Sequence, residues 1–236
     1  MKYLNFHAFN NALRRGREAF PGGRRAARAG QFQIQNHTLP DRYPWMFEFA
    51  AEQFAGRAGI QLLSFGCSRG EEVFSLRKYL PAAAIKGMDI DPQNIKRARK
   101  RASSEPAEGL TFAVASTTEQ EPTGHYDAVF CLAVLCRGDL TATGASRCDP
   151  HMYFADFERQ VADFARCLKP GGFLFLHTTN FRFQDTAIAA QFEVALEVAP
   201  AQLAPDLLFD RNNQVLPGAR YLEVGFRKRH APAKAD

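Results

Sequence analysis

The sequence predicts an α/β fold with a mostly parallel sheet that helices cover on both faces. From residue 61 onward, short apolar runs alternate with segments of helical periodicity, which is the pattern of successive strand–helix units. The apolar runs carry few polar residues, as expected of strands that are buried on both faces. A turn with two glycines joins the first run to the first helix, which is where an open parallel sheet binds its ligand.

Charge separates residues 1–40 from the rest of the chain. They hold seven Lys or Arg against one acid, Glu18, in a chain whose net charge is +5. The stretch "PGGRRAARAG" is too poor in apolar side chains to bury much surface. We expect a basic N-terminal extension that is a lid over the substrate, a flexible leader, or an arm for nucleic acid or an acidic partner. Residues 41–236 then form one domain.

The domain begins with an amphipathic helix. Pro44 suits the first helical position, Asp41 is placed to cap the helix, and Gly56 and Gly59 end it. The remaining elements are expected in the order strand 61–65, helix 71–79, strand 84–88, helix 92–102 capped by Asp91, strand 110–115, strand 126–132, helix 154–168, strand 173–178, a helix near 185–198 and a strand near 221–227.

The five cysteines fit a reduced interior better than a disulfide framework. They are odd in number and none forms a Cys-x-x-Cys pair, at Cys67, Cys131, Cys136, Cys148 and Cys167. The sequence contains no run of about 18 apolar residues, the length that is needed to span a bilayer. The N-terminus lacks the pattern of a secretory signal. We therefore expect a soluble cytoplasmic protein without a structural zinc site.

The turn after the first strand lies in "LLSFGCSRGEEVFSL", residues 62–76. Gly66 and Gly70 let the backbone approach a ligand, and glycine tolerates the turn geometry. In dinucleotide-binding turns a diphosphate rests on the helix N-terminus. Here Glu71 and Glu72 occupy the first helical turn, and their charge would repel a diphosphate. A ligand that carries an ammonium group fits this turn better.

The second strand ends in an acid. Asp89 lies in "IKGMDIDP", and an acid at that place can accept hydrogen bonds from the hydroxyls of a ribose. Met88 and Ile90 flank it as apolar neighbours for a nucleoside. Helix capping does not require Asp89, because Asp91 already stands at the cap position. An adenosine with an ammonium-bearing tail and no diphosphate describes S-adenosylmethionine.

Four segments together resemble the motifs of class I S-adenosylmethionine-dependent methyltransferases. They are "LLSFGCSRGEEVFSL", "GMDIDPQNIKRAR", "YDAVFCLAVL" and "FADFERQVADFARCLKPGGFLFLHTTNF", and the resemblance covers about residues 61–183. The catalytic domain of the chemotaxis receptor glutamate methyltransferases is the most similar family, through its G-E-E turn and its D-I-D strand end. The resemblance implies a Rossmann-like, seven-stranded sheet whose last strand runs antiparallel.

The resemblance also implies cofactor contacts. It places the turn at the methionine end, Glu72 at the ammonium group and Asp89 at the ribose. One of Ser116 and Thr117 would lie near the adenine, and the end of the fourth strand would lie under the sulfonium. The candidate cofactor-binding residues are Gly66, Cys67, Ser68, Gly70, Glu72, Asp89, Ile90, Ser116, Thr117, Cys131 and Leu132.

The chain departs from that family where the methyl acceptor would bind. The family follows its "FC" with Arg-Asn and a nearby tyrosine, whereas this chain continues as "LAVLCR" from Leu132 to Arg137. Neither the helical receptor-binding domain nor the small inserted β-subdomain is evident. The resemblance therefore predicts the fold and the cofactor, and it leaves the acceptor open.

The loop after the fourth strand is the expected source of acceptor-side residues. "CRGDLTATGASRCDPHMYFADF" is long and polar, and it offers Arg137, His151 and Tyr153 as candidate catalytic residues. Histidine can take a proton near neutral pH, so His151 is the preferred base, although each of the three could also cap a helix or lie at the surface. His177, at the end of the fifth strand, is either a site residue or a core histidine. No metal-ligand spacing is present.

We predict a methyltransferase that transfers a methyl group from S-adenosylmethionine to a small molecule by in-line displacement. Aromatic residues near the N-terminus, such as Phe32 and Trp45, would enclose an organic acceptor better than a polymer. Two alternatives stay open. One is a protein or RNA acceptor reached through the basic N-terminus, and the other is a module that binds S-adenosylmethionine without catalysis. No membrane partner is expected.

Overall fold

The structure is a computed structural model that describes residues 31–33, 38–104, 108–199, 203 and 206–230. Most of the predicted N-terminal extension lies outside these residues. The helices are α2 (Pro44–Gln53), α3 (Glu71–Tyr79), α4 (Pro92–Ser104), α5 (Gly138–Thr143) and α6 (Phe154–Cys167), with the short 3-10 turns η1 (Phe183–Asp185) and η2 (Ala189–Gln191). The strands are β1 (Gln61–Phe65), β2 (Ala84–Asp89), β3 (Leu110–Val114), β4 (Tyr126–Leu132), β5 (Leu168–His177), β6 (Phe192–Glu197) and β7 (Glu223–Lys228).

The strands form one sheet in the order β3-β2-β1-β4-β5-β7-β6. β1 pairs in parallel with β2 and β4, and further parallel pairs join β2 to β3 and β4 to β5. β7 runs antiparallel to both of its neighbours, β5 and β6. The predicted fold is therefore confirmed: a mostly parallel, seven-stranded sheet whose last strand is antiparallel.

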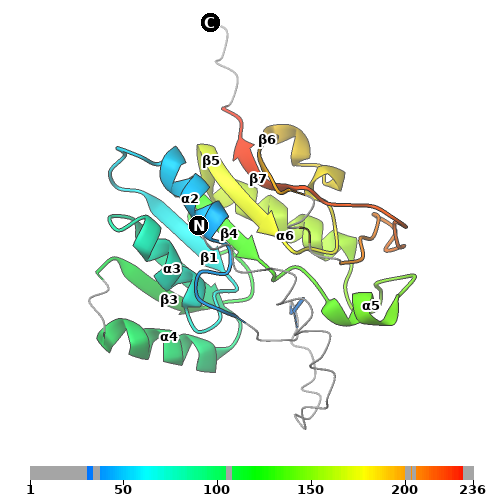
Figure 1. The fold of residues 1–236 in the computed structure, drawn as a ribbon, viewed down its shortest axis with the longest axis horizontal. Coiled ribbons are helices and arrows are strands. Elements are labelled where there is room, and N and C mark those ends of the chain that lie inside the picture. Colours follow the sequence, from blue (N-terminus) through cyan, green and yellow to red (C-terminus); the bar gives the residue numbers. More distant parts are fainter. Residues whose placement is uncertain (1–30, 34–37, 105–107, 200–202, 204–205, 231–236) are drawn as a thin grey trace, which may run out of the picture.

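The strand order reverses between β1 and β4. From β1 the chain moves outward to β2 and β3, and it then returns to place β4 on the other side of β1 (Figure 1). The loops that leave these two strands diverge, which opens a crevice at the carboxyl edge of a sheet. The register aligns Phe65 with Met88 and Ser64 with Phe130. The ends of β1, β2 and β4 consequently meet at one place.

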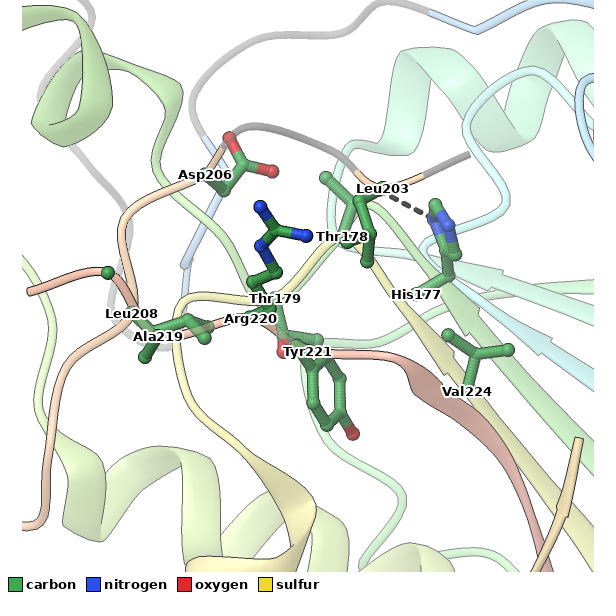
Figure 2. Close-up of a pocket in the computed structure, with 11 residues that line it drawn as sticks. His177, Thr178, Thr179, Leu203, Asp206, Leu208, Ala219, Arg220, Tyr221 and Val224 are labelled. Atoms are coloured by element: carbon green, nitrogen blue, oxygen red, sulfur yellow. Dashed lines mark hydrogen bonds between the residues drawn. The ribbon is translucent and has the colours of Figure 1, made fainter. Parts of the chain in front are cut away.

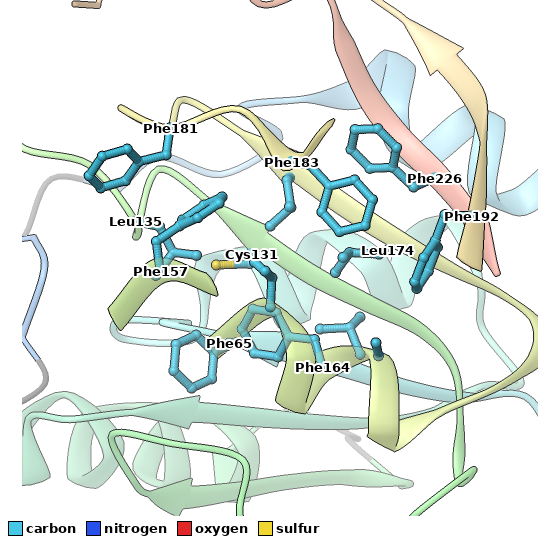
Figure 3. Packing of buried hydrophobic residues seen from close by; sticks show 14 of the residues in the cluster. Phe65, Cys131, Leu135, Phe157, Phe164, Leu174, Phe181, Phe183, Phe192 and Phe226 are labelled. Atoms are coloured by element: carbon cyan, nitrogen blue, oxygen red, sulfur yellow. The ribbon is translucent and has the colours of Figure 1, made fainter. Parts of the chain in front are cut away.

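Apolar layers cover the sheet on both faces, as predicted. Leu63 and Val129 belong to the layer beneath α6, which also contains Phe164, and Figure 3 shows the aromatic rings that fill it. Leu62 and Phe130 belong to the opposite layer, beneath α2, α3 and α4. Successive residues of β1 and β4 thus point to opposite faces, which is the geometry of a strand. These two layers hold the strand ends rigidly in place.

The predicted helix near residues 185–198 is wrong. That segment contains the turn η2 and then strand β6, which pairs with β7. Without β6, β7 would be an unprotected edge of the sheet. Phe192 is buried and its ring lies 5.2 Å from the ring of Phe183, centroid to centroid. Strand pairing and packing therefore override the helix propensity of the alanines and leucines in this segment.

Of the two predicted helix caps, the one at Asp41 is wrong and the one at Asp91 is confirmed. The N-cap residue of α2 is Tyr43, and Asp41 lies outside the helix, where its carboxylate pairs with Lys78 at 2.7 Å. The cap of α4 is confirmed, because the Asp91 carboxylate accepts a hydrogen bond from the Gln93 N–H at 2.9 Å. Asp41 has a φ of 50°, and this left-handed turn carries its carboxylate toward α3 and away from α2.

The cysteines are buried, as predicted for core residues. All five are free thiols in the interior, and Cys131 and Cys167 pack in the layer beneath α6. Among the described residues, none of the helices has the length and apolar character that a bilayer span requires.

Candidate functional site

The turn between β1 and α3 has the conformation that its glycines allow. Gly66 and Gly70 have φ values of 77° and 91°, in the left-handed region that favours glycine. A Cβ atom on Gly66 would lie 2.3 Å from Val134 Cγ2, and a Cβ atom on Gly70 would lie 2.9 Å from the ring of Phe74. The two glycines therefore permit the turn, and Gly66 also lets the loop after β4 lie directly against it.

Three residues other than glycine adopt the left-handed conformation after three neighbouring strands. Ser68, Ala133 and Thr178 have φ values of 52°, 58° and 57°, and they follow β1, β4 and β5. Such conformations cost free energy and gather at functional sites. The last two loops are joined, because the Ala133 N–H donates to the His177 carbonyl at 2.8 Å. The carboxyl edge of the sheet is thus the candidate site.

Glu72 turns back from the first turn of α3 toward β1. Its Oε1 accepts a hydrogen bond from Ser64 Oγ at 2.7 Å. Burial raises the pKa of Glu72 to about 7, although the Ser64 hydrogen bond and the charge of Arg42 act in the opposite direction. When burial disfavours the ionised form of a carboxyl group, a cation beside it stabilises that form. Glu72 is therefore well suited to an ammonium group.

Asp89 is buried at the end of β2, where its carboxylate already accepts three hydrogen bonds. The Ser68 N–H donates to Oδ2 at 2.8 Å. The Asp91 N–H and the Asn94 amide donate to Oδ1 at 2.8 and 3.0 Å. Asp89 thereby joins the turn after β1 to the start of α4, a structural role that sequence reasoning missed. Because a carboxylate has about four lone-pair sites, it can still accept one hydroxyl.

A cavity of about 650 Å³ lies beside the end of β3, and we call it the β3-side cavity. Ser116 and Thr117, which were predicted near the adenine, line this cavity. His151 and Tyr153, which were predicted as catalytic residues, line it too, and so does Phe32 of the N-terminal extension. The structure thus brings two candidate cofactor residues and two candidate catalytic residues to one cavity.

The last residues of β4 present backbone rather than side chains to the site. Cys131 packs in the apolar layer beneath α6, and Leu132 packs in the opposite layer. Cys67 is likewise buried, beneath α3 and α4. Ile90 is partly exposed just beyond β2, where an apolar side chain can contact a ligand. The side chains of the other three residues pack in the core, so only their backbone atoms are available to the candidate site.

Arg137 is buried and already paired. Its guanidinium donates two hydrogen bonds to the Asp139 carboxylate, at 2.9 and 2.7 Å. This pairing raises the pKa of Arg137 and lowers the pKa of Asp139. The Arg137 N–H donates to Asn180 Oδ1 at 2.5 Å. Arg137 consequently fastens the loop after β4 to the segment after β5, and it does not line the β3-side cavity.

A second cavity, of about 450 Å³, lies at the end of β5, and we call it the β5-end cavity (Figure 2). It is lined by His177, Thr178, Thr179, Leu203, Asp206, Leu208, Gly218, Ala219, Arg220, Tyr221 and Val224. In the register of β4 and β5, His177 lies opposite Leu132. The β5-end cavity therefore adjoins the end of β4, where the sulfonium is expected.

His177 is a buried and neutral side chain. Burial, helped by the charge of Arg42, lowers the pKa of His177 to about 3. A hydrogen bond joins its Nδ1 to Thr178 Oγ1 at 2.7 Å. Its ring centroid lies 4.8 Å from that of Tyr43 and 5.8 Å from that of Trp45. These contacts fix the ring, and so low a pKa makes His177 a poor proton acceptor at neutral pH.

Asp206 is a functional candidate that sequence reasoning missed. Its Oδ2 is buried and makes no hydrogen bond within the part of the chain that the structure describes. Burial raises the pKa of Asp206, and a hydrogen bond from Thr141 and the charge of Arg42 oppose this. The only signal in the sequence is an acid inside the apolar run "LAPDLLF", which has neither helical nor strand periodicity.

Comparisons with known proteins agree with the fold. Residues 63–176 match the family model described as "Methyltransferase domain", a region that runs from β1 almost to the end of β5. The solved structure of the YcgJ protein from Bacillus subtilis aligns with a TM-score of 0.51 and 12% identity, over 80% of this chain and 100% of that chain. No curated protein matches the chain.

Other solved structures align less closely. The [4+2]-cyclase SpnF aligns with a TM-score of 0.46 and 18% identity, over 63% of this chain and 50% of that chain. Geranyl diphosphate C-methyltransferase from Streptomyces coelicolor A3(2) aligns with a TM-score of 0.42 and 18% identity, over 57% of this chain and 43% of that chain. The alignments thus span about half the length of these two proteins.

Proposed function

We propose that this chain, whose residues 63–176 match the family model described as "Methyltransferase domain", transfers a methyl group from S-adenosylmethionine to a small organic acceptor. The observation that carries this proposal is a pair of carboxyl groups on either side of the turn at residues 66–70: Glu72, which is partly buried, and Asp89, which is buried. Glu72 suits an ammonium group, and Asp89 can accept a ribose hydroxyl. A nucleoside with an amino-acid tail requires both, at the carboxyl edge of a parallel sheet.

In this proposal, different residues around the turn hold different parts of the cofactor. Bound S-adenosylmethionine supplies a methyl group that a positively charged sulfur activates. Glu72 holds the ammonium group, and Asp89 holds one ribose hydroxyl without giving up its contacts to Ser68 and α4. Ser116 and Thr117 accommodate the adenine end. We also assign His151 and Tyr153 to that end, because they share the β3-side cavity with these residues.

The acceptor is proposed to be a small molecule because the cavity beside the end of β4 has a small volume. The β5-end cavity has a volume of about 450 Å³, within the range of roughly 300–1,000 Å³ that small-molecule sites have. Leu203, Leu208 and Val224 form apolar walls, and Asp206 and Thr178 supply polar groups. Polar and apolar side chains share the lining about equally, which suits an organic molecule that carries both kinds of group.

We propose that the N-terminal extension, residues 1–40, acts as a lid over the β3-side cavity. Phe32 lines the β3-side cavity, and Gln33 Nε2 donates to Cys136 Sγ at 3.2 Å. These contacts support a lid, and they attach it to the loop after β4. Residues 1–30 and 34–37, which carry the basic character, lie outside the described residues.

The deciding experiment uses S-adenosylmethionine with a radiolabelled methyl group. The protein is incubated with labelled donor and cell extract, and the small molecules are then separated from protein and RNA. We expect label in the small-molecule fraction. Label in protein or RNA would support the macromolecular alternative. Tight calorimetric binding of S-adenosylhomocysteine with no labelled product would favour a module without catalysis.

The resemblance to the chemotaxis receptor glutamate methyltransferases belongs among these alternatives. It rests on the G-E-E and D-I-D motifs around Glu72 and Asp89, and it would imply methyl esters on protein glutamates. Methyl esters release methanol in mild base, whereas methyl ethers and methylamines do not. Protein-bound label that mild base releases would support that narrower function.

We propose a cytoplasmic location as well. The support is chemical: five buried cysteines remain free thiols, which suits a reducing compartment. When cells are fractionated, immunoblotting should detect the protein in the cytosolic fraction. Detection in another fraction would contradict this location.

A further inference from the structure

We propose that the β5-end cavity receives the methyl acceptor and that Asp206 takes the proton from an acceptor hydroxyl. This inference rests on the proposed function and deepens it, because it names the acceptor class: an organic molecule that carries a hydroxyl group. Figure 2 shows the residues that line the cavity, with the charged ends of Asp206 and Arg220 on the same side of it.

The position of the cavity fits an acceptor site. His177 lies opposite Leu132 in the pairing of β4 with β5, and its carbonyl accepts a hydrogen bond from the Ala133 N–H at 2.8 Å. The β5-end cavity is therefore one strand away from the end of β4. Glu72 lies on the other side of β4, above β1, where its side chain reaches Ser64. A donor over β1 and β4 would accordingly direct its methyl group toward β5.

The backbone next to Asp206 is held firmly. The Leu207 N–H donates to Thr141 Oγ1 of α5 at 3.0 Å. Asn180 Nδ2 donates to the Leu207 carbonyl at 2.7 Å, and the Phe209 N–H donates to the Asn180 carbonyl at 2.8 Å. Two neighbouring segments thus fix the backbone that directly follows Asp206. A catalytic group requires such support if it is to keep a productive geometry.

Asp206 is the better proton acceptor of the two candidates in the cavity. His177 Nδ1 is engaged with Thr178 at 2.7 Å, and burial lowers the pKa of His177 to about 3. Asp206 Oδ2 is buried without a hydrogen bond from any described residue. Burial raises the pKa of Asp206 above the usual value of a carboxyl group, despite the opposing charge of Arg42. A more basic carboxylate is a more effective general base.

The surrounding charges favour a hydroxyl over an amine. Arg220 lines the same cavity and the charge of Arg42 acts on Asp206, so positive charge offsets the attraction of the Asp206 carboxylate for a protonated amine. A hydroxyl is neutral, and it becomes a good nucleophile when it loses its proton. The acceptor oxygen forms a bond to the methyl carbon while the methyl–sulfur bond breaks. The electron pair of that bond stays on sulfur, and the hydroxyl proton passes to the Asp206 carboxylate.

The test uses p-cresol as the probe and two-dimensional NMR as the readout. In the wild-type protein with S-adenosylhomocysteine bound, we expect p-cresol to shift the amide signals of Thr178 and Tyr221, which line the cavity. In Asp206→Asn the affinity should fall roughly tenfold, because a charge-assisted hydrogen bond becomes a neutral one. Glu193→Gln removes a surface carboxylate on β6 and should leave the affinity unchanged.

Two further measurements make the result decisive. The methyl ether of p-cresol cannot donate a hydrogen bond to Asp206, so it should bind wild type weakly, and its affinity should not fall in Asp206→Asn, whose amide can donate to the ether oxygen. Ala219→Phe fills part of the cavity and should abolish the p-cresol shifts, while thermal melting and S-adenosylhomocysteine affinity confirm that it is folded. Calorimetry should give the same S-adenosylhomocysteine affinity for Asp206→Asn as for wild type.

The failure of this inference differs from the failure of the proposed function. If p-cresol does not bind the wild type, or binds Asp206→Asn as well as wild type, the role of Asp206 and the acceptor class are overturned while cofactor binding remains. If S-adenosylhomocysteine binds none of the folded proteins, the proposed function fails, and a loss of p-cresol affinity in Asp206→Asn would then support only a binding cavity. Such a cavity without a donor would overturn the catalytic role of Asp206.

Discussion

The Glu72 carboxyl group accepts a hydrogen bond from the Ser64 hydroxyl across the join of β1 and α3, with 2.7 Å between Oε1 and Oγ. This contact turns Glu72 inward, over the strand, although it lies in the first turn of a surface helix. Burial then makes its ionisation unfavourable in the absence of a cation. Ligand binding and stability are therefore expected to oppose each other at this residue.

Glu72→Gln should stabilise the ligand-free protein at high pH. The pKa of Glu72 is raised from 4.5 to about 7. The contribution of this side chain to the free energy of unfolding is therefore largest below pH 4.5, and it is lost as the pH rises through 7. At pH 8 the variant should be more stable than wild type by roughly 1–3 kcal/mol, and near pH 4.5 the difference should vanish. Chemical denaturation at both pH values measures it, and equal stability at pH 8 would contradict the burial of an ionised Glu72.

The same residue predicts a pH dependence of cofactor binding. Only the ionised carboxylate attracts the ammonium group of S-adenosylhomocysteine, so affinity should rise as the pH increases through about 7. Binding at a pH just below that value should release a proton, because the bound cation lowers the pKa of Glu72. Calorimetry in two buffers of different ionisation enthalpy detects this proton. The Glu72→Gln variant should release none and should bind at least tenfold more weakly.

Asp89→Ala should weaken binding of S-adenosylmethionine by at least tenfold, because a hydrogen bond from the ribose to a charged group is lost. The structure adds a second effect. The Ser68 and Asp91 N–H groups and the Asn94 amide would lose their acceptor, so the melting temperature should also fall. Asn94→Ala removes one of these internal contacts and leaves the carboxylate in place, and it should bind the cofactor nearly as well as wild type. Wild-type affinity in folded Asp89→Ala would remove Asp89 from the site.

The sheet could be predicted from the sequence because its local patterns agree with its tertiary structure. The runs at 61–65 and 126–132 are apolar, they are bounded by turn residues, and they became β1 and β4 with those limits. At residues 192–197 the local sequence pattern does not by itself predict the observed structure. "FEVALE" alternates as a strand does, but the alanines before it favour a helix, and only pairing with β7 decides between them. The sequence of this segment alone does not show that β7, a strand far along the chain, needs a partner.

The candidate site likewise contains residues that local patterns predicted and residues that only tertiary packing brings together. The turn at 66–70 and Asp89 could be found because fixed spacing after a strand places them at the carboxyl edge. Asp206 and Arg42 lie outside regular elements, and they approach His177 only through the folding of distant segments. His151 and Tyr153 were recognised as polar loop residues, but the direction of their loop, toward Ser116 and Thr117, depends on packing that no motif encodes.

Asp127→Asn should lower stability without affecting the cofactor. Its carboxylate is buried near the start of β4 and accepts hydrogen bonds from Arg57, Lys169 and the Gln61 N–H at 2.6, 2.7 and 2.9 Å. The amide cannot satisfy all three donors, and we expect a loss of about 2 kcal/mol, moderated because the arginine and lysine are partly exposed. This end of the strand is opposite to the site, so S-adenosylhomocysteine affinity should not change. A weaker affinity would contradict this separation.

Gly66→Ala should destabilise the protein through a clash as well as through its backbone conformation. Gly66 has a φ of 77°, and a Cβ atom there would lie 2.3 Å from Val134 Cγ2. Gly124 also has a positive φ, 61°, but a Cβ atom there would meet nothing within 4 Å. Gly124→Ala should therefore cost only the backbone term of about 1 kcal/mol. Gly66→Ala should cost roughly 2–4 kcal/mol.

A second substitution separates the two terms at Gly66. Val134→Ala removes both γ carbons that the new Cβ atom would strike, so adding it to Gly66→Ala should recover most of the difference from Gly124→Ala. Denaturant unfolding of the two single variants and the double variant forms a mutant cycle, and the coupling free energy should favour the double variant by at least about 1 kcal/mol. Additive effects would mean that the loop after β4 does not rest on this turn. The contact matters for the proposed function, in which the two loops together form the floor of the site for the cofactor and the acceptor.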